Sequence, residues 1–441
     1  MARAATATRV SPARRVAFAV VRRTFERGAY TDRALRAEAG RAGLRGRELA
    51  FATRLSYGAV QRRRTLDAVV SDLAGRPVDA LDPPVLAALR LGVLQLAYLD
   101  GVADHAAVDQ SVELAKAAGR GHRLVNAVLR RATDEARARV AALRDDTPEA
   151  AALKHSHPDW VARLWWDSLG PGEARALMAA NNEPAETAVR VNTLTADAAE
   201  VARRTGGRRV DDLPEGLVVD RAPDLGDELM PQSRASMAVA RVLAPRPGER
   251  VLDLCAAPGA KATHLAALME NRGLVVAVER DADRANELRA TCRRLHATCV
   301  EVRVADAREP VADAAFDRVL VDPPCSGLGT LQSRPDLRWR IRAGDVPELA
   351  ERQAAILDAA AGALRPGGLL VYSTCTLSPR ENEDQVAALR ARRPDLLARD
   401  RHDDLPPWEH PRMPEFLQPM PHRHGTAGFF IARLRREEAS R

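Results

Sequence analysis

The sequence predicts a multidomain protein with an all-helical N-terminal domain (residues 1–140), a small α+β connector (141–240) and a C-terminal α/β domain (241–441). Three observations predict this division. The chain has 441 residues, which is longer than one ordinary domain. Apolar residues recur at helical spacing in the first part. In the last part, short apolar segments alternate with helical ones, which indicates a mostly parallel, doubly wound sheet.

The N-terminal domain contains helical patterns only. Ser11-Pro12 and Pro83-Pro84 each suit a helix start. A third helix is expected through residues 124–129, with arginines on its other face. No segment of this domain shows the strict alternation of a half-buried strand. The apolar positions that give the second helix its period are Val85, Leu86, Leu89, Val93 and Leu96.

Charge is distributed unevenly along the chain. Residues 1–140 contain 25 Lys+Arg against 14 Asp+Glu, whereas the remainder contains 42 against 46. A basic helical domain beside a slightly acidic body indicates a module that binds a polyanion such as RNA. A solvated, arginine-rich helical surface is the alternative, because the chain uses only three lysines. One of those three is Lys261.

Composition and cysteine usage exclude several classes of protein. No run of 18 or more apolar residues occurs, so no membrane partner is expected. An odd number of cysteines argues for reduced thiols in a cytoplasmic protein. None forms a C-x-x-C pair, so no metal is expected, and Cys292 and Cys299 are expected to be packing residues. The five cysteines are Cys255, Cys292, Cys299, Cys325 and Cys375.

The connector is the hardest part to interpret. Three of the five tryptophans lie in it, at positions 160, 165 and 166. Residues 189–192 predict a short strand. We therefore expect a small mixed domain here.

In the C-terminal domain, ligands are expected at the carboxyl ends of the strands. The loop after the first strand, residues 253–261 (DLCAAPGAK), is rich in small residues that let backbone approach a ligand closely. Glu279 follows the second strand and Asp306 the third, where acids suit ribose hydroxyls and a base amino group. Each acid alone is typical of a solvated loop. Together with the loop after the first strand, however, they place polar groups at three strand ends in register, which indicates a nucleoside pocket. The expected strands are 251–254, 274–278, 302–304, 319–321 and 369–372.

Two thiols follow the fourth and fifth strands. Cys325 lies in Asp322-Pro-Pro-Cys-Ser and Cys375 in Ser-Thr-Cys-Thr. Cytosine C5 is a poor nucleophile until a thiolate adds to C6, which makes C5 enamine-like and able to attack an electrophilic methyl group. A base must then remove the C5 proton, and a carboxyl group near N3 would stabilise the adduct. Cys375, Cys325 and Asp322 suit these roles, although spacing leaves open which thiol does which. Two buried structural cysteines are the alternative.

These motifs together resemble a known family. Residues 253–261, 322–326, 373–375 and 379–383 resemble the RNA cytosine-C5 methyltransferases, and the second cysteine separates that family from enzymes that use only the Pro-Cys cysteine. Residues 123–130 resemble the NusB antitermination-factor fold. Together, nearly the whole chain resembles the bacterial 16S ribosomal RNA methyltransferase family RsmB, also called Fmu or Sun. The resemblance implies a NusB-like RNA-binding domain and a Rossmann-like class I methyltransferase domain.

The resemblance also implies a cofactor and residue roles. The cofactor is S-adenosylmethionine, Cys375 is the nucleophile, Cys325 assists product release, and Asp322 belongs to both the catalytic and the cofactor set. The implied cofactor-binding residues are Cys255, Ala256, Ala257, Pro258, Gly259, Ala260, Lys261, Glu279, Asp306 and Asp322.

Three positions depart from the family pattern. Ala260 stands where a second glycine is usual and adds only a methyl group. Glu279 replaces the commoner aspartate and keeps the carboxylate. Ala427 replaces a usual aspartate, which leaves the role of its loop open.

The expected partner is RNA, with 16S ribosomal RNA preferred and transfer RNA as the alternative, and a monomer is expected. The target base must leave its stack, so an unstacked cytosine is the natural substrate. Phosphate contacts by the basic domain predict salt-dependent binding. Arg334, Asp336 and Trp339 are expected near the base, with an ordinary loop as the alternative.

Two other classes of function remain. A nicotinamide-dependent oxidoreductase shares the sheet, but only one of the three glycine positions of its fingerprint could be filled, and paired thiols would have no use. A non-catalytic RNA-binding or antitermination protein would leave both cysteine motifs unexplained.

Overall fold

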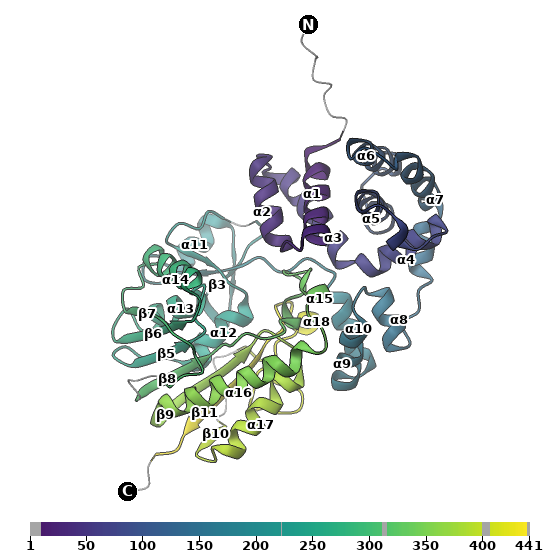
Figure 1. The fold of residues 1–441 in the computed structure, drawn as a ribbon. Helices are drawn as coiled ribbons and strands as arrows, with labels where there is room; N and C mark the ends of the chain where they lie inside the picture. The colour runs from purple at the N-terminus through teal and green to yellow at the C-terminus, as the bar shows by residue number, and fades with distance from the viewer. Residues whose placement is uncertain (1–9, 222, 311–314, 399–405, 439–441) are drawn as a thin grey trace. The chain divides into compact units, whose positions relative to one another are not determined.

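The computed structural model describes residues 10–221, 223–310, 315–398 and 406–438 (Figure 1). The chain forms two compact units. The first consists of Met1–Pro184 and Leu331–Arg340, and the second of Ala185–Thr330 and Ile341–Arg441. Within the described ranges, no helix is both long and apolar enough to cross a membrane.

The first unit is helical, which confirms the all-α N-terminal domain. Its central helix, α5 (Pro83–Tyr98), is apolar around most of its circumference and buried along most of its length. A Cβ on Gly92 would lie 2.5 Å from the Cδ1 of Leu129, so glycine allows the close approach of α5 and α7. The other helices are α1 (Pro12–Arg27), α2 (Thr31–Arg41), α3 (Gly46–Gln61), α4 (Arg63–Ala74), η1 (Val78–Ala80), α6 (Asp104–Ala117), α7 (His122–Ala141), α8 (Pro148–Lys154), α9 (Asp159–Leu169), α10 (Pro171–Ala180) and α15 (Leu337–Arg340).

The segment Leu331–Arg340 packs inside this helical unit. Arg338 is fully buried and donates to the carbonyl oxygens of Asn181 (2.9 Å) and Ser156 (3.1 Å). The Trp339 indole donates to the Val60 carbonyl at 2.7 Å, and the buried Asp336 pairs with Arg340. Asp336 and Trp339 thus take part in the packing of this unit, and the expectation that they lie near the base stays a prediction.

Arg334, from the same segment, is exposed, and its expected contact with the base stays a prediction. The 141–240 connector does not coincide with a compact unit. Helices α8 to α10 group with the first unit, and the strands from residue 188 onward group with the second.

The second unit contains a seven-stranded sheet in the order β10-β11-β9-β8-β5-β6-β7. The five strands β5 to β9 are mutually parallel, and β11 runs antiparallel to both β9 and β10. This confirms the predicted Rossmann-like α/β fold. The strands are β5 (Arg250–Leu254), β6 (Leu274–Glu279), β7 (Val300–Val304), β8 (Phe316–Val321), β9 (Leu364–Thr374), β10 (Leu396–Ala398) and β11 (Phe430–Arg436).

Alternate strand residues fill two cores, one on each face of this sheet. Val251 and Leu320 pack with helices α12, α13 and α14, whereas Leu252 and Val319 pack with α16 and α17 (Figure 1). The sheet is thus the middle layer of three. The helices of the second unit are α11 (Ala198–Thr205), α12 (Arg234–Leu243), α13 (Ala260–Leu268), α14 (Ala282–Arg294), η2 (Leu328–Thr330), α16 (Asp345–Ala363), η3 (Pro379–Glu381), α17 (Glu383–Arg392) and α18 (Pro421–His424).

A smaller antiparallel sheet, in the order β2-β3-β1-β4, precedes the large one in the same unit. Its central strand β1 confirms the short strand predicted at 189–192. With α11, it encloses a separate small core that includes Val189 and Val201. The strands are β1 (Ala188–Val191), β2 (Arg208–Val210), β3 (Leu213–Val218) and β4 (Leu229–Pro231).

Candidate active site

The candidate site lies at the carboxyl edge of the parallel strands. Leu254 at the end of β5 is in register with Val278 of β6 and Val321 of β8, and Val321 is in register with Tyr372 of β9. Because these strands are parallel, the loops that follow them emerge at the same edge. The motifs predicted at these strand ends therefore meet at one edge of the sheet.

The loop after β5 turns sharply into α13. Cys255 has a φ of 66° and Gly259 a φ of 105°, both in the left-handed region. A Cβ on Gly259 would lie 2.7 Å from the Cδ1 of Leu288, so this position requires glycine. Burial raises the pKa of the Cys255 thiol to about 12, which keeps it neutral. Cys255 is therefore a half-buried part of the turn between β5 and α13.

Two acids follow the next two strands. Glu279 ends β6, is almost fully buried, accepts a hydrogen bond from the amide of Asp281 (3.1 Å) and pairs with Arg284. Asp306 lies two residues beyond β7 and pairs with Arg308, which lowers its pKa to about 2. At the ends of neighbouring strands, these carboxylates are placed as acceptors for hydroxyl or amino groups.

Asp322 is held by two partners at the end of β8. The Lys261 ammonium lies 2.5 Å from Oδ2, and the Ser373 hydroxyl donates to Oδ1 at 2.9 Å. Burial alone would lower the pKa of Lys261, but the adjacent Asp322 carboxylate raises it above its usual value. The ammonium also lies 5.5 Å from the centre of the Phe429 ring. Lys261 therefore keeps its proton, which lies next to Asp322.

The two predicted thiols are in contact. The Sγ atoms of Cys325 and Cys375 lie 3.3 Å apart, and both side chains are partly accessible. The contact with Cys375 and burial raise the pKa of Cys325 well above its usual value. Cys325 therefore retains its proton, which lies beside the sulfur of Cys375.

Glu381 joins the two cysteine loops. It accepts from the backbone N of Ser326 (2.8 Å), one residue after Cys325, and from the Ser326 hydroxyl (2.5 Å). The Tyr372 hydroxyl, three residues before Cys375, donates to the Glu381 carbonyl at 2.6 Å. The sequence motif at 379–383 predicts no role for its individual members, and the structure shows that Glu381 fixes both loops.

A third loop, containing Ala427, meets the cysteine loops through a glycine–glycine contact. Gly329 N donates to the Cys375 carbonyl (3.0 Å), and Gly428 N donates to the Gly329 carbonyl (2.8 Å). A Cβ on Gly329 would lie 1.9 Å from the Gly428 carbonyl oxygen. The loop with the unusual Ala427 is thus adjacent to the thiol site.

Asp253 is a buried acid for which the sequence pattern predicts no role of its own. Its side chain is 1% exposed, and neither carboxylate oxygen has a hydrogen-bond partner among the described residues. Burial raises its pKa to about 8. Asp253 is thus a buried acid near Lys261 and Asp322 that forms no hydrogen bond among the described residues. Such a group at the end of β5 indicates a site for a polar ligand.

This sheet order, with a glycine turn after the first parallel strand and acids after the next two, defines an S-adenosylmethionine-dependent methyltransferase. The chain belongs to the RsmB/F family of ribosomal RNA methyltransferases. The sequence model of that family, "16S rRNA methyltransferase RsmB/F", matches residues 240–435. The NusB family matches residues 11–134, and the ferredoxin-like domain of RsmF/B-like methyltransferases matches 157–225.

Individual relatives match over nearly their full length. Ribosomal RNA small subunit methyltransferase B of Thermus thermophilus is 38% identical, covering 92% of each chain. The protein named probable ribosomal RNA small subunit methyltransferase B in Synechocystis is 34% identical, covering 96% of this chain and 99% of its own. The crystal structure of PH0851 has a TM-score of 0.80 at 26% identity, covering 96% of this chain and 99% of that one. NSun6 from Pyrococcus horikoshii with SFG has a TM-score of 0.58 at 26% identity, covering 63% and 98%.

Proposed function

We propose that this protein methylates C5 of a cytosine in 16S ribosomal RNA through a covalent bond between Cys375 and C6 of the base. The observation that carries the proposal is the 3.3 Å contact between the Cys325 and Cys375 sulfurs, beside the Lys261–Asp322 pair. Paired thiols suit addition to a pyrimidine and have no use in hydride transfer or in RNA binding alone. The preference for 16S ribosomal RNA rests on the family and on relatives named ribosomal RNA small subunit methyltransferase B.

The residues at the sheet edge fit S-adenosylmethionine. Gly259 lets α13 begin in close contact with Leu288 of α14, and helix N-termini favour anionic groups such as a carboxylate. Glu279 and Asp306 suit ribose hydroxyls and the base, and Asp322 with the unsatisfied Asp253 adds acceptors for a cationic group. When bound, the cofactor supplies an electrophilic methyl group. The cofactor set named from the family resemblance is therefore retained as part of the proposal.

The thiols and the Lys261–Asp322 pair perform the chemistry on the base. The Cys375 thiolate adds to C6 while Lys261–Asp322 provides a proton at N3, so the electron pair moves to C5 and forms the C5–methyl bond. Loss of the C5 proton to a base then sends electrons back into the ring and expels the Cys375 sulfur, and N3 returns its proton. Cys325 protonates that sulfur as it leaves. After the reaction, as before it, Cys325 and Cys375 together carry one proton.

We assign binding of the RNA around the target base to the basic helical unit. Arg123 and Arg130 are exposed on α7, on the face opposite its buried Val125, Val128 and Leu129. Positive side chains on one helix face suit phosphate contacts, which position RNA without reading its sequence. We retain the expectations of a cytoplasmic monomer as part of this proposal.

Nucleoside mass spectrometry tests the proposal. Unmodified 16S ribosomal RNA and transfer RNA are incubated separately with the protein and S-adenosylmethionine, and 5-methylcytidine is quantified. We expect new 5-methylcytidine in 16S ribosomal RNA only. Its appearance in transfer RNA only would keep the mechanism and contradict the substrate. Its absence from both, with cofactor binding demonstrated, would contradict the catalytic assignment.

A further inference from the structure

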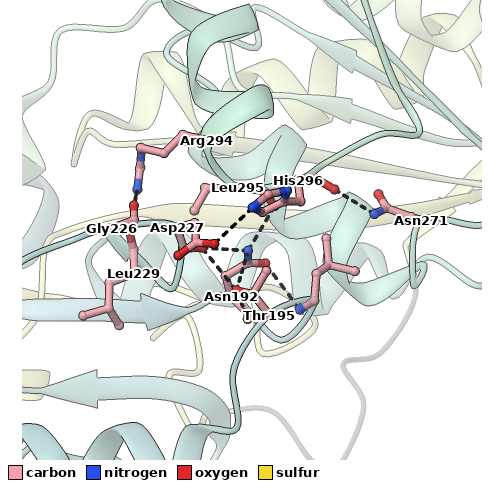
Figure 2. Close-up of polar contacts among 10 residues, drawn as sticks. Asn192, Thr195, Gly226, Asp227, Leu229, Asn271, Arg294, Leu295 and His296 are labelled. Atoms are coloured by element: carbon pink, nitrogen blue, oxygen red, sulfur yellow. Dashed lines mark hydrogen bonds and ion pairs between the residues drawn. The ribbon is translucent and has the colours of Figure 1, made fainter.

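Arg190 lies in β1 and Asn192 directly follows this strand, and their side chains contact different segments of the methyltransferase fold. Both side chains are buried, at 0% and 1% exposure. Asn192 donates to the Leu295 carbonyl at the end of α14 (3.0 Å; Figure 2). Arg190 donates to the Ala260 carbonyl (2.7 Å) at the start of α13. Strand β1 thus contacts the start of α13, and the residue that follows the strand contacts the end of α14.

The junction around Asn192 holds the small sheet against α14. Asp227 pairs with His296 at 3.0 Å, and Arg294 donates to the carbonyls of Gly226 (2.6 Å) and Leu229 (2.9 Å; Figure 2). These contacts attach the small sheet firmly without touching the loop after β5. Because these contacts already attach the small sheet, Arg190 is not needed to hold the two sheets together.

Arg190 fixes two consecutive carbonyl groups of the cofactor loop. One guanidinium nitrogen bonds the Ala260 carbonyl directly, and the other bonds the Thr263 hydroxyl at 2.9 Å. That hydroxyl in turn donates to the Gly259 carbonyl at 2.7 Å. Gly259 is the N-cap of α13 and has no side chain with which to cap the helix. The orientation of the first turn is therefore set from outside, by a residue 70 positions earlier in the chain.

Stability alone does not explain an arginine at this position. Neither acceptor of its two bonds is a carboxylate, and burial lowers the pKa of Arg190 to about 9, although the nearby Glu215 carboxylate opposes that shift. Its Nε has no partner among the described residues. A buried cation is costly, and a positive charge near a helix N-terminus opposes the helix dipole. An arginine at this position therefore indicates a function at the adjacent loop.

We propose that Arg190 is a positioning residue for S-adenosylmethionine: it holds the Gly259–Ala260 turn in the conformation that receives the cofactor. This inference rests on the proposed use of S-adenosylmethionine. It adds the small ferredoxin-like sheet to the residues that shape the cofactor site.

Binding of S-adenosylhomocysteine to the full-length protein, measured by calorimetry without RNA, tests this inference. We expect Arg190→Met to weaken binding at least tenfold. Arg190→Lys, with one ammonium in place of a two-pronged guanidinium, should fall between Arg190→Met and the wild type. The matched control is Asn192→Ala, at a buried polar residue just after the same strand, which should lower the Tm but change the affinity less than twofold. Wild-type affinity in Arg190→Met, or an equal loss in Asn192→Ala, would overturn the inference.

A second variant covers the case in which Arg190→Met fails to fold. Thr263→Val is nearly isosteric and removes the hydroxyl that joins Arg190 to the Gly259 carbonyl, so it should weaken binding about threefold to tenfold, and unchanged affinity would overturn the inference. The readout is independent of methylation. Wild-type protein that binds S-adenosylhomocysteine but leaves RNA unmethylated would contradict the proposed reaction, while the role of Arg190 would still be decided by the affinities.

Discussion

The sulfur atoms of Cys325 and Cys375 lie 3.3 Å apart although 50 positions separate them in the chain. They meet because β8 and β9 are neighbouring parallel strands whose following loops emerge at the same edge. The raised pKa of Cys325, caused first by its contact with Cys375, distinguishes two chemically similar side chains. This difference supports the proposal that Cys325 keeps its proton and that Cys375 is the nucleophile.

Cys375→Ala should therefore abolish methylation. We expect at least a thousandfold loss of 5-methylcytidine formation, because the base is no longer activated by addition at C6. Affinity for S-adenosylhomocysteine should remain within about twofold. The control is Cys299→Ala, at a buried cysteine that packs in the core, which should retain activity. Substantial methylation by Cys375→Ala would contradict its role as the nucleophile.

Cys325→Ala should stop the reaction at a later stage. If Cys325 protonates the departing sulfur, its loss slows release, and the protein should remain bonded to methylated RNA. A band of protein–RNA adduct should then survive denaturing electrophoresis in the presence of S-adenosylmethionine. The double variant with Cys375→Ala should form no adduct. An adduct in the double variant, or none in Cys325→Ala with normal turnover, would exclude the assigned roles.

The sequence predicted that the site motifs lie at one edge of the sheet, because they follow buried parallel strands. Apolar runs located β5 to β9, and parallel topology places their ends together, so the thiols, Asp322 and Lys261 could be associated without coordinates. The antiparallel strands β10 and β11 were not predicted. Strand β11 carries three arginines in seven residues, so its sequence does not look like a buried strand. It forms a strand because it pairs with β9, a long-range contact that the local sequence pattern does not encode.

Residues that act through other loops were harder to foresee. In the sequence, Arg190 is one polar position in a short strand, and its bonds to α13 depend on how the small sheet packs. Arg338 is one of many arginines, yet it is fully buried among carbonyl groups of the helical unit. A basic residue in sequence is expected to be solvated, and only the fold reveals that these two are not.

Stability should fall as the pH drops below 6.5. Burial lowers the pKa of His264 to about 4, so the neutral ring donates from Nε2 to Glu215 at 2.7 Å. Between pH 6.5 and 4, the unfolded chain binds a proton that the folded protein does not, and folding loses up to about 1.4 kcal/mol per pH unit from this group. Burial opposes ionisation of Glu215, but its bonds to His264 and Arg241 lower its pKa below the usual value, which adds a loss in the same direction below about pH 4.5.

Urea denaturation at pH 7, 6 and 5 measures this dependence. His264→Gln keeps a donor toward Glu215 but cannot titrate, so its stability should vary less over the same range. An equal slope in the wild type and His264→Gln would show that other groups control the dependence.

RNA binding should weaken steeply with salt through the basic helical unit. Replacing both Arg123 and Arg130 by glutamine should reduce the slope of log K against log salt by about 1 for each phosphate that is no longer neutralised. Fluorescence anisotropy with a 16S ribosomal RNA fragment at several salt concentrations measures the slope. Arg272→Gln, an exposed arginine of the other unit, is the control. An unchanged slope in the double variant would place the RNA-binding surface elsewhere.

Gly329→Ala should separate catalysis from cofactor binding. The added Cβ would lie 1.9 Å from the Gly428 carbonyl oxygen, which is backbone and cannot move aside cheaply. The Gly329 amide bonds the Cys375 carbonyl, so a shift at this position displaces the nucleophile while the loop after β5 is untouched. We expect a loss of turnover of about tenfold or more, with S-adenosylhomocysteine affinity nearly unchanged. Gly344→Ala, where nothing lies within 4 Å of the new Cβ, should behave as wild type. Full activity in Gly329→Ala would show that the Ala427 loop tolerates displacement and does not set the position of Cys375.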